Sequence, residues 1–290
     1  MIEVVCAARR ENLLGEGVCW DVAAGRVWWV DIKKSLIEWI NPQTGEGGSH
    51  LVGARPSALA PRGDGTLLVA SDLGLAVFDP RSGGMTQRLE LEPDRPWNRT
   101  NDAGVDSAGR FWVGTMDDTQ ARRSGAVYRL ETDWRVTRVL DGLGIPNTLA
   151  TSPDGRTLYV ADSADEILVA YELDPRTGDL GAARAFADTR GQGGTPDGSA
   201  MDAEGFLWNA QWGLWRLVRY APDGRVDRIV ELPVEQPTKC AFGGADLRTL
   251  YITSAREGLS EESLALQPLA GSLLAFEPGV QGFAPPAFGG

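Results

Sequence analysis

One structural unit recurs six times along the sequence: a polar residue, an apolar strand, a turn and a second apolar strand. The turn residues are Gly25, Gly65, Gly109, Gly155 and Gly205, and the sixth turn lies near Leu247. Turns spaced by roughly 40 to 50 residues are typical of four-stranded propeller blades. The residue three positions past each turn is large and apolar, as packing between blades requires. The sequence therefore predicts an all-β fold, a six-bladed β-propeller with four-stranded blades, in which residues 1–290 form a single domain.

The N-terminal segment is expected to close the ring. The strand-like stretch from Glu3 to Ala7 would pair into the last blade, which protects edge strands from other partners. The 36 glycines, 17 prolines and 10 tryptophans favour many turns and short strands over long helices. The only helix that we expect is a turn or two between Ser260 and Leu266.

Charge and cysteine content restrict the possible partners and compartments. A formal net charge of −12 argues against nucleic acids and anionic membranes as partners. No apolar run reaches the roughly 18 residues of a membrane span, and the N-terminus lacks the pattern of a signal peptide. Three cysteines at unrelated spacings, Cys6, Cys19 and Cys240, fit buried thiols in a reducing compartment. We therefore expect a cytoplasmic protein with no nucleic-acid and no membrane partner.

The sequence contains a single histidine, His50, which lies in a Gly-Gly-Ser-His loop. This argues against a Ser-His-Asp triad, a histidine-ligated zinc site and a histidine general base. A metal bound by this chain would be held mostly by oxygen atoms, which favours hard cations such as calcium, magnesium or manganese.

A polar residue stands at nearly the same distance before each turn. The distance is eight residues in five units and nine in the first, whose turn has one extra alanine. These polar residues are Glu16, Ser57, Asn101, Asn147, Asp197 and Lys239. Because the first strand of each blade lines the central channel of a propeller, they should meet at one depth. The sequence thus predicts a polar ring at one mouth of the channel.

Within this ring, Glu16, Asn147 and Asp197 provide two carboxylates and an amide oxygen. Such a set can hold a divalent cation and leave room for water, as metal-assisted hydrolysis requires. Polar residues that simply face water where a strand begins are the alternative. Thr195-Pro196-Asp197-Gly198 also has the composition of a plain turn. This blade already has its turn at Gly205, so we expect Asp197 to begin a strand.

Several segments, in this order, resemble the SMP-30/gluconolactonase family over nearly the whole chain. They are Leu14-Gly15-Glu16-Gly17 with Trp20, Asn98-Arg99-Thr100-Asn101-Asp102, Gly109 to Met116, Pro146-Asn147, Thr195 to Gly198, and Phe242-Gly243-Gly244. The family consists of six-bladed propellers that are sugar lactonases. The resemblance thus implies the same fold as the repeats.

The resemblance also implies roles for individual residues. Glu16, Asn147 and Asp197 match the family's metal ligands, and Asp197 matches its proposed general base. Arg99 and Asn101 match its substrate-binding pair. Some members place a glutamate in the loop after Met116, where this sequence has Thr119 preceded by Asp117 and Asp118. Asp117 and Thr119 are therefore the expected additional substrate-binding residues, in place of the glutamate.

These observations predict a lactonase of carbohydrate metabolism that hydrolyses a sugar lactone to the aldonic acid. One divalent cation, calcium, zinc, magnesium or manganese, would act as Lewis acid, and Asp197 would activate water. A non-catalytic, metal-binding regulatory propeller is the alternative. A propeller esterase acting on other esters is a third, although the pair of Arg99 and Asn101 favours a polyhydroxylated substrate.

Overall fold

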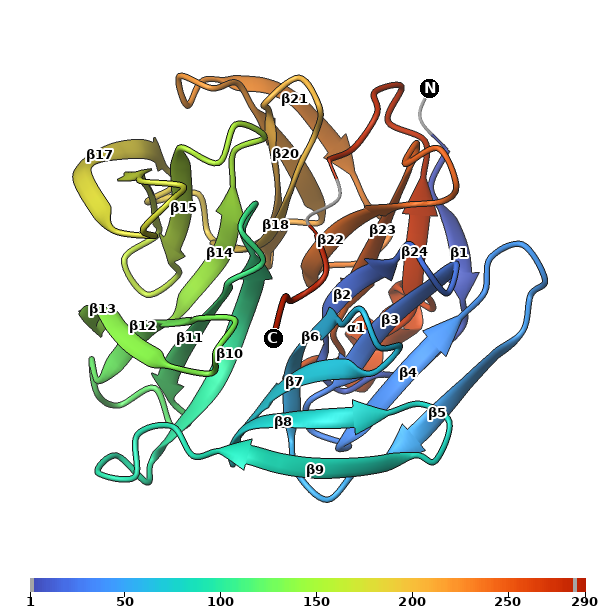
Figure 1. Cartoon of the computed structure of the whole chain (residues 1–290). Helices are drawn as coiled ribbons and strands as arrows, with labels where there is room; N and C mark the ends of the chain where they lie inside the picture. The colour runs from blue at the N-terminus through green and yellow to red at the C-terminus, as the bar shows by residue number, and fades with distance from the viewer. Residues whose placement is uncertain (1–2, 284–285) are drawn as a thin grey trace.

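The computed structural model describes residues 3–283 and 286–290, and these residues form six four-stranded antiparallel sheets. The sheets stand in a ring around a central axis (Figure 1). The six-bladed propeller predicted from the repeats is therefore confirmed. Among these described residues, no helix is long and apolar enough to cross a membrane.

Each of the first five blades uses four strands that are consecutive in the chain, from the axis outward. The first two blades contain β2 (Gly15–Asp21), β3 (Arg26–Asp31), β4 (Leu36–Ile40), β5 (Gly47–Leu51), β6 (Pro56–Pro61), β7 (Leu67–Ser71), β8 (Gly74–Asp79) and β9 (Gly84–Leu89). The third and fourth contain β10 (Asn98–Val105), β11 (Phe111–Asp117), β12 (Gly125–Leu130), β13 (Val136–Leu143), β14 (Pro146–Thr151), β15 (Thr157–Asp162), β16 (Ile167–Leu173) and β17 (Leu180–Asp188). The fifth contains β18 (Thr195–Met201), β19 (Leu207–Trp212), β20 (Arg216–Tyr220) and β21 (Val226–Glu231).

The sixth blade joins the two ends of the chain. Its strands are β22 (Pro237–Gly243), β23 (Thr249–Ser254), β24 (Leu273–Phe276) and, outermost, β1 (Val5–Ala8). In this pairing Val5 lies opposite Ala275, so the predicted closure by the N-terminal strand is confirmed. The short helix α1 (Glu261–Leu266) follows Ser260, whose side chain caps it by accepting a hydrogen bond from the Ser263 amide. This is the helix expected from the sequence.

The innermost strand of every blade loses its regular pairing at the same level. In β2 the register shifts between Glu16 and Cys19, and in β18 it shifts between Pro196 and Ser199, on either side of Asp197. The other four inner strands shift at the corresponding place. An irregularity of this kind bends a strand and redirects its side chains. Because each polar ring residue lies at such a shift, local strand geometry sets where its side chain points.

Two blades share a turn motif that anchors a buried tryptophan, Asp-x-x-Gly-x-x-Trp. In the fifth blade the Asp202 carboxylate accepts a hydrogen bond from Trp208 Nε1 at 3.0 Å. In the third blade Asp106 accepts one from Trp112 Nε1 at 2.9 Å. Both indole rings are fully buried, as predicted from their position in the repeat. The motif thus fixes the turn and the packing between blades together.

The first blade shows what one inserted residue does to this motif. Four positions separate Asp21 from Gly25, where the other two blades have three. The Asp21 side chain accepts a hydrogen bond from the Ala24 amide at 3.0 Å. Trp28 is as buried as its counterparts, but its Nε1 has no partner among the described residues. The longer turn therefore leaves one indole donor unsatisfied.

The described C-terminal residues on either side of positions 284–285 lie at the end of the channel away from the polar ring. The Phe283 amide donates to the Met201 carbonyl at 3.0 Å, and the Phe288 amide donates to the Pro61 carbonyl at 2.8 Å. Figure 1 shows the C-terminus at the centre of the ring. A mostly apolar cavity of about 320 Å³ lies within the channel, and both Lys239 and Phe283 line it. These described residues therefore cover the far end of the channel, which the repeat pattern did not reveal.

Candidate functional site

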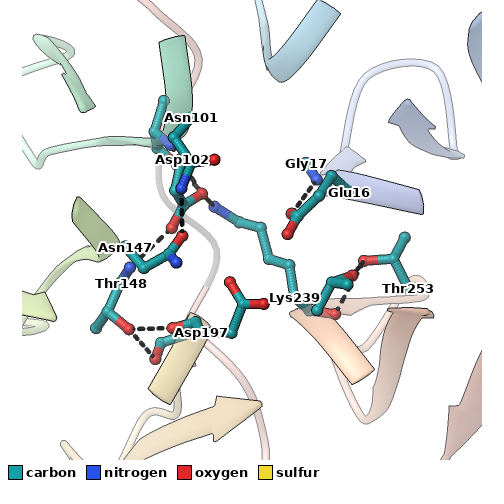
Figure 2. A network of polar contacts seen from close by, with 12 residues as sticks. Glu16, Gly17, Asn101, Asp102, Asn147, Thr148, Asp197, Lys239 and Thr253 are labelled. Atoms are coloured by element: carbon teal, nitrogen blue, oxygen red, sulfur yellow. Dashed lines mark hydrogen bonds and ion pairs between the residues drawn. The ribbon is translucent and has the colours of Figure 1, made fainter. Parts of the chain in front are cut away.

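The six polar ring residues all lie on innermost strands, as the spacing predicted. Figure 2 shows the side chains of Glu16, Asn147 and Asp197 facing the same space at the axis. All three are buried, with 9%, 4% and 7% of their surface exposed. Asp197 belongs to β18, so the prediction that it begins a strand is confirmed. Strands that are far apart in sequence thus bring two carboxylates and an amide together.

Burial and mutual repulsion make these carboxyl groups reluctant to ionise. Burial, reinforced by the negative charge of Asp102, raises the pKa of Glu16 to about 8. Burial also raises the pKa of Asp197 well above its usual value, and the charges of Glu16 and Asp102 add to the effect. The ammonium group of Lys239 acts in the opposite direction on both. A further positive charge between Glu16 and Asp197 would therefore stabilise their ionised forms.

A hydroxyl group sets the orientation of the Asn147 amide. Ser163 Oγ donates to the Pro196 carbonyl at 2.6 Å and accepts a hydrogen bond from Asn147 Nδ2 at 2.9 Å. The amide oxygen of Asn147 therefore lies on the other side, where it accepts from Asn101 Nδ2 at 3.0 Å. A carbonyl oxygen has two lone pairs, so one stays available for a cation.

Arg99 and Asn101 form one unit beside this cluster. Arg99 Nη1 donates to Asn101 Oδ1 at 2.9 Å, and Arg99 Nε donates to Asp118 at 2.7 Å. Asp118 also accepts a hydrogen bond from Arg55 at 2.8 Å. Burial alone would raise the pKa of Asp118, but the hydrogen bonds from Arg55 and Arg99 outweigh it and lower that pKa. Asp118 thus holds Arg99 in place as an ionised partner.

In the loop after Met116, Asp117 and Thr119 contact each other, whereas Asp118 contacts Arg99. Asp117 is fully buried and accepts hydrogen bonds from the Thr119 amide at 3.0 Å and from Thr119 Oγ1 at 2.8 Å. Its other oxygen pairs with Arg122 at 3.1 Å. Asp117 therefore shapes the loop through its own hydrogen bonds. Asp118 is the carboxylate of this loop that reaches Arg99.

The residues at the axis have the donor set that a divalent cation needs. Glu16 and Asp197 are buried carboxylates, and no described lysine or arginine forms an ion pair with them, since Lys239 is bound to Asp102. In the part of the chain that the structure describes, no three His, Cys, Asp or Glu side chains gather closely enough to hold a metal. A cation here would thus need the Asn147 oxygen as its third protein ligand, with water completing the coordination.

Sequence reasoning missed three residues that organise this region: Asp102, Ser163 and Asp118. Asp102 follows a ring residue by one position, and the other two follow the second strands of their blades. No spacing rule marks them, because they lie outside the phase of the polar ring. Only Asp118 carried a partial signal, through its place in the loop after Met116.

Comparison with known proteins places this propeller in a family. Residues 14–256 match the family described as SMP-30/Gluconolactonase/LRE-like region. A 6-deoxy-6-sulfogluconolactonase from Pseudomonas putida is 36% identical over 98% of this chain and 98% of its own length. An L-arabinolactonase from Azospirillum brasilense is 36% identical over 98% of this chain and 94% of its own.

A solved structure gives the same result in three dimensions. The crystal structure of a calcium-binding protein, regucalcin, from Agrobacterium tumefaciens matches with a TM-score of 0.95 and 36% identity. The match covers 99% of this chain and 97% of that one. The chain therefore belongs to the SMP-30/gluconolactonase/LRE-like family, as its motifs predicted. The names of the two enzymes agree with the predicted lactonase.

Proposed function

We propose that this protein hydrolyses a sugar lactone with the help of one divalent cation. The observation that supports this best is the group of Glu16, Asn147 and Asp197 at the channel mouth, beside the donors of Arg99 and Asn101. Two relatives at 36% identity are named as lactonases of sugar acids. A third is named a calcium-binding protein, which supports the binding of a divalent cation by this chain.

Glu16, Asn147 and Asp197 would hold the cation, which could be calcium, zinc, magnesium or manganese. When bound, it would polarise the lactone carbonyl as a Lewis acid. Arg99 would donate hydrogen bonds to the sugar from its planar guanidinium group, and Asn101 would fix the position of that group. Asp117 would shape the loop beside the sugar. Thr119, which is hydrogen-bonded to Asp117, would lie next to the substrate.

Asp197 would act as the general base. Its carboxylate takes one proton from a water molecule as the water oxygen bonds to the lactone carbonyl carbon. The bond between that carbon and the ring oxygen then breaks. The proton returns to the ring oxygen, which becomes a hydroxyl group of the aldonic acid. Atoms and charges balance, and Asp197 is regenerated as a carboxylate.

Turnover of a panel of sugar γ- and δ-lactones tests this proposal. Metal-stripped protein should hydrolyse them no faster than buffer, and refilling with one divalent cation at a time should restore turnover. Activity that survives complete metal removal would contradict the proposed role of the cation. Metal binding without turnover of any lactone would instead support the non-catalytic regulatory propeller.

A neutral lactone should be preferred over one that carries an anionic group. Arg55 and Arg99 share Asp118, and Arg122 is paired with Asp117, so these cations already have carboxylate partners. To pair with one of these arginines, an anionic substituent would have to displace the carboxylate that already binds it. We expect kcat/KM for gluconolactone to exceed that for its 6-deoxy-6-sulfo derivative at least about tenfold, a difference of about 1.4 kcal/mol in transition-state binding. The reverse order would show that an arginine is released from its partner.

A further inference from the structure

The side chain of Lys239 crosses the channel from the sixth blade to the third. Its Nζ donates hydrogen bonds to Asp102 and, at 2.8 Å, to the Ala103 carbonyl (Figure 2). Gly198 makes room for it, because a Cβ atom there would lie 2.6 Å from Lys239 Cγ. Lys239 and Asp102 are both buried. The pair therefore spans the floor beneath the candidate metal site.

Asp102 uses its second oxygen to hold the inner strand of the fourth blade. Asp102 Oδ2 accepts a hydrogen bond from the Thr148 amide at 2.9 Å. Thr148 has φ of 63°, a left-handed conformation that is uncommon for a β-branched residue. It follows Asn147 directly, at the place where β14 loses its register. Asp102 thus stabilises the backbone shape that directs the Asn147 side chain toward the axis.

Thr148 in turn connects the fourth blade to the fifth. Its hydroxyl group donates to the main-chain carbonyl of Asp197 and lies 2.9 Å from Ser199 Oγ. Asn209 Nδ2 donates to the same Asp197 carbonyl at 2.8 Å. Thr148 therefore joins the irregular segments that carry Asn147 and Asp197, in addition to the link through Ser163.

We propose that Lys239, Asp102 and Thr148 are positioning residues that fix Asn147 and Asp197 relative to each other and thereby set the affinity for the divalent cation. This inference rests on the proposed function. The competing explanation is that Lys239 and Asp102 only neutralise each other inside the channel. Buried ion pairs can often be replaced by apolar residues without loss of stability, so the two explanations can be separated.

A matched pair of variants tests the connection between blades. Thr148→Val removes the hydroxyl group but keeps the β-branched shape, whereas Thr148→Ser keeps the hydroxyl group. Titration calorimetry with Mn²⁺ should show a dissociation constant at least tenfold higher for Thr148→Val and within about threefold of wild type for Thr148→Ser. Thr151→Val, on the same strand at its other end, should bind Mn²⁺ like wild type.

A double variant tests the ion pair. Lys239→Met with Asp102→Leu removes both charges and also the acceptor of the Thr148 amide. Positioning predicts Mn²⁺ binding at least tenfold weaker, in a protein whose thermal unfolding stays cooperative. Charge neutralisation alone predicts unchanged Mn²⁺ affinity.

The outcomes separate this inference from the proposal on which it rests. Wild-type protein that binds no Mn²⁺ and no other divalent cation would overturn both. Wild-type binding that is matched by Thr148→Val and by the double variant would overturn the positioning role alone. The positioning role would be established if Mn²⁺ binding is weakened in Thr148→Val and in the double variant but stays close to wild type in Thr148→Ser.

Discussion

Replacing Asp197 with asparagine is expected to lower kcat/KM for the best lactone by at least about a thousandfold, because two contributions are lost together. General-base catalysis by a positioned carboxylate contributes about 10² to 10⁴ in rate. The same side chain is one of only two carboxylates in the candidate metal site, so the cation is also bound less tightly. Asparagine has nearly the same shape, and the buried carboxyl group already has a raised pKa, so the fold should persist.

The sequence itself provides a control for this variant. Asp223 lies in another Pro-Asp-Gly tripeptide, in the turn between β20 and β21. Its side chain pairs with Arg225 at 2.7 Å and is largely exposed. Asp223→Asn should therefore retain full lactonase activity. Metal titration of Asp197→Asn would then separate lost cation binding from lost base catalysis, and wild-type turnover in Asp197→Asn would rule out the assigned role.

The fold could be predicted because one backbone conformation recurs at each turn. The five turn glycines all have positive φ, between 62° and 82°. In the sixth turn Leu247 adopts the same left-handed conformation, with φ of 56°. Counting from the expected turn position therefore located Lys239 correctly, although a leucine gives no composition signal for such a turn. Spacing was informative here because it reflects backbone geometry, which tolerates an unfavourable residue.

From spacing alone, the candidate site could be predicted only where it follows the repeat. Glu16, Asn147 and Asp197 share one phase, so periodicity found them. Asp102 lies one position out of phase, and the ammonium group that it binds belongs to a residue 137 positions away. Contacts of this kind depend on how blades meet across the channel. No local pattern in a single sequence encodes them.

The strongest effect on stability is expected from Asp202→Ala. This fully buried carboxylate accepts hydrogen bonds from two turn amides and from Trp208 Nε1, and it pairs with Arg219 at 2.7 Å. Its removal leaves the indole donor and the turn amides without partners. It also leaves the buried guanidinium group of Arg219 with only two carboxylate partners among the described residues, Glu204 and Asp227. Removing one member of such a network costs about 3 to 5 kcal/mol.

The equivalent turn of the fourth blade gives the comparison for this prediction. There Ser152 takes the place of Asp202, three residues before the turn glycine. Its hydroxyl group accepts one hydrogen bond, from the Thr157 amide at 3.0 Å, and donates one to the exposed Asp154 at 2.6 Å. Ser152→Ala should therefore cost only about 1 kcal/mol in urea unfolding. If the two variants lost equal stability, the turn amides alone would account for the effect. A larger loss in Asp202→Ala would instead show that the bonds to Trp208 and Arg219, which tie the turn to the interface between blades, carry most of the energy.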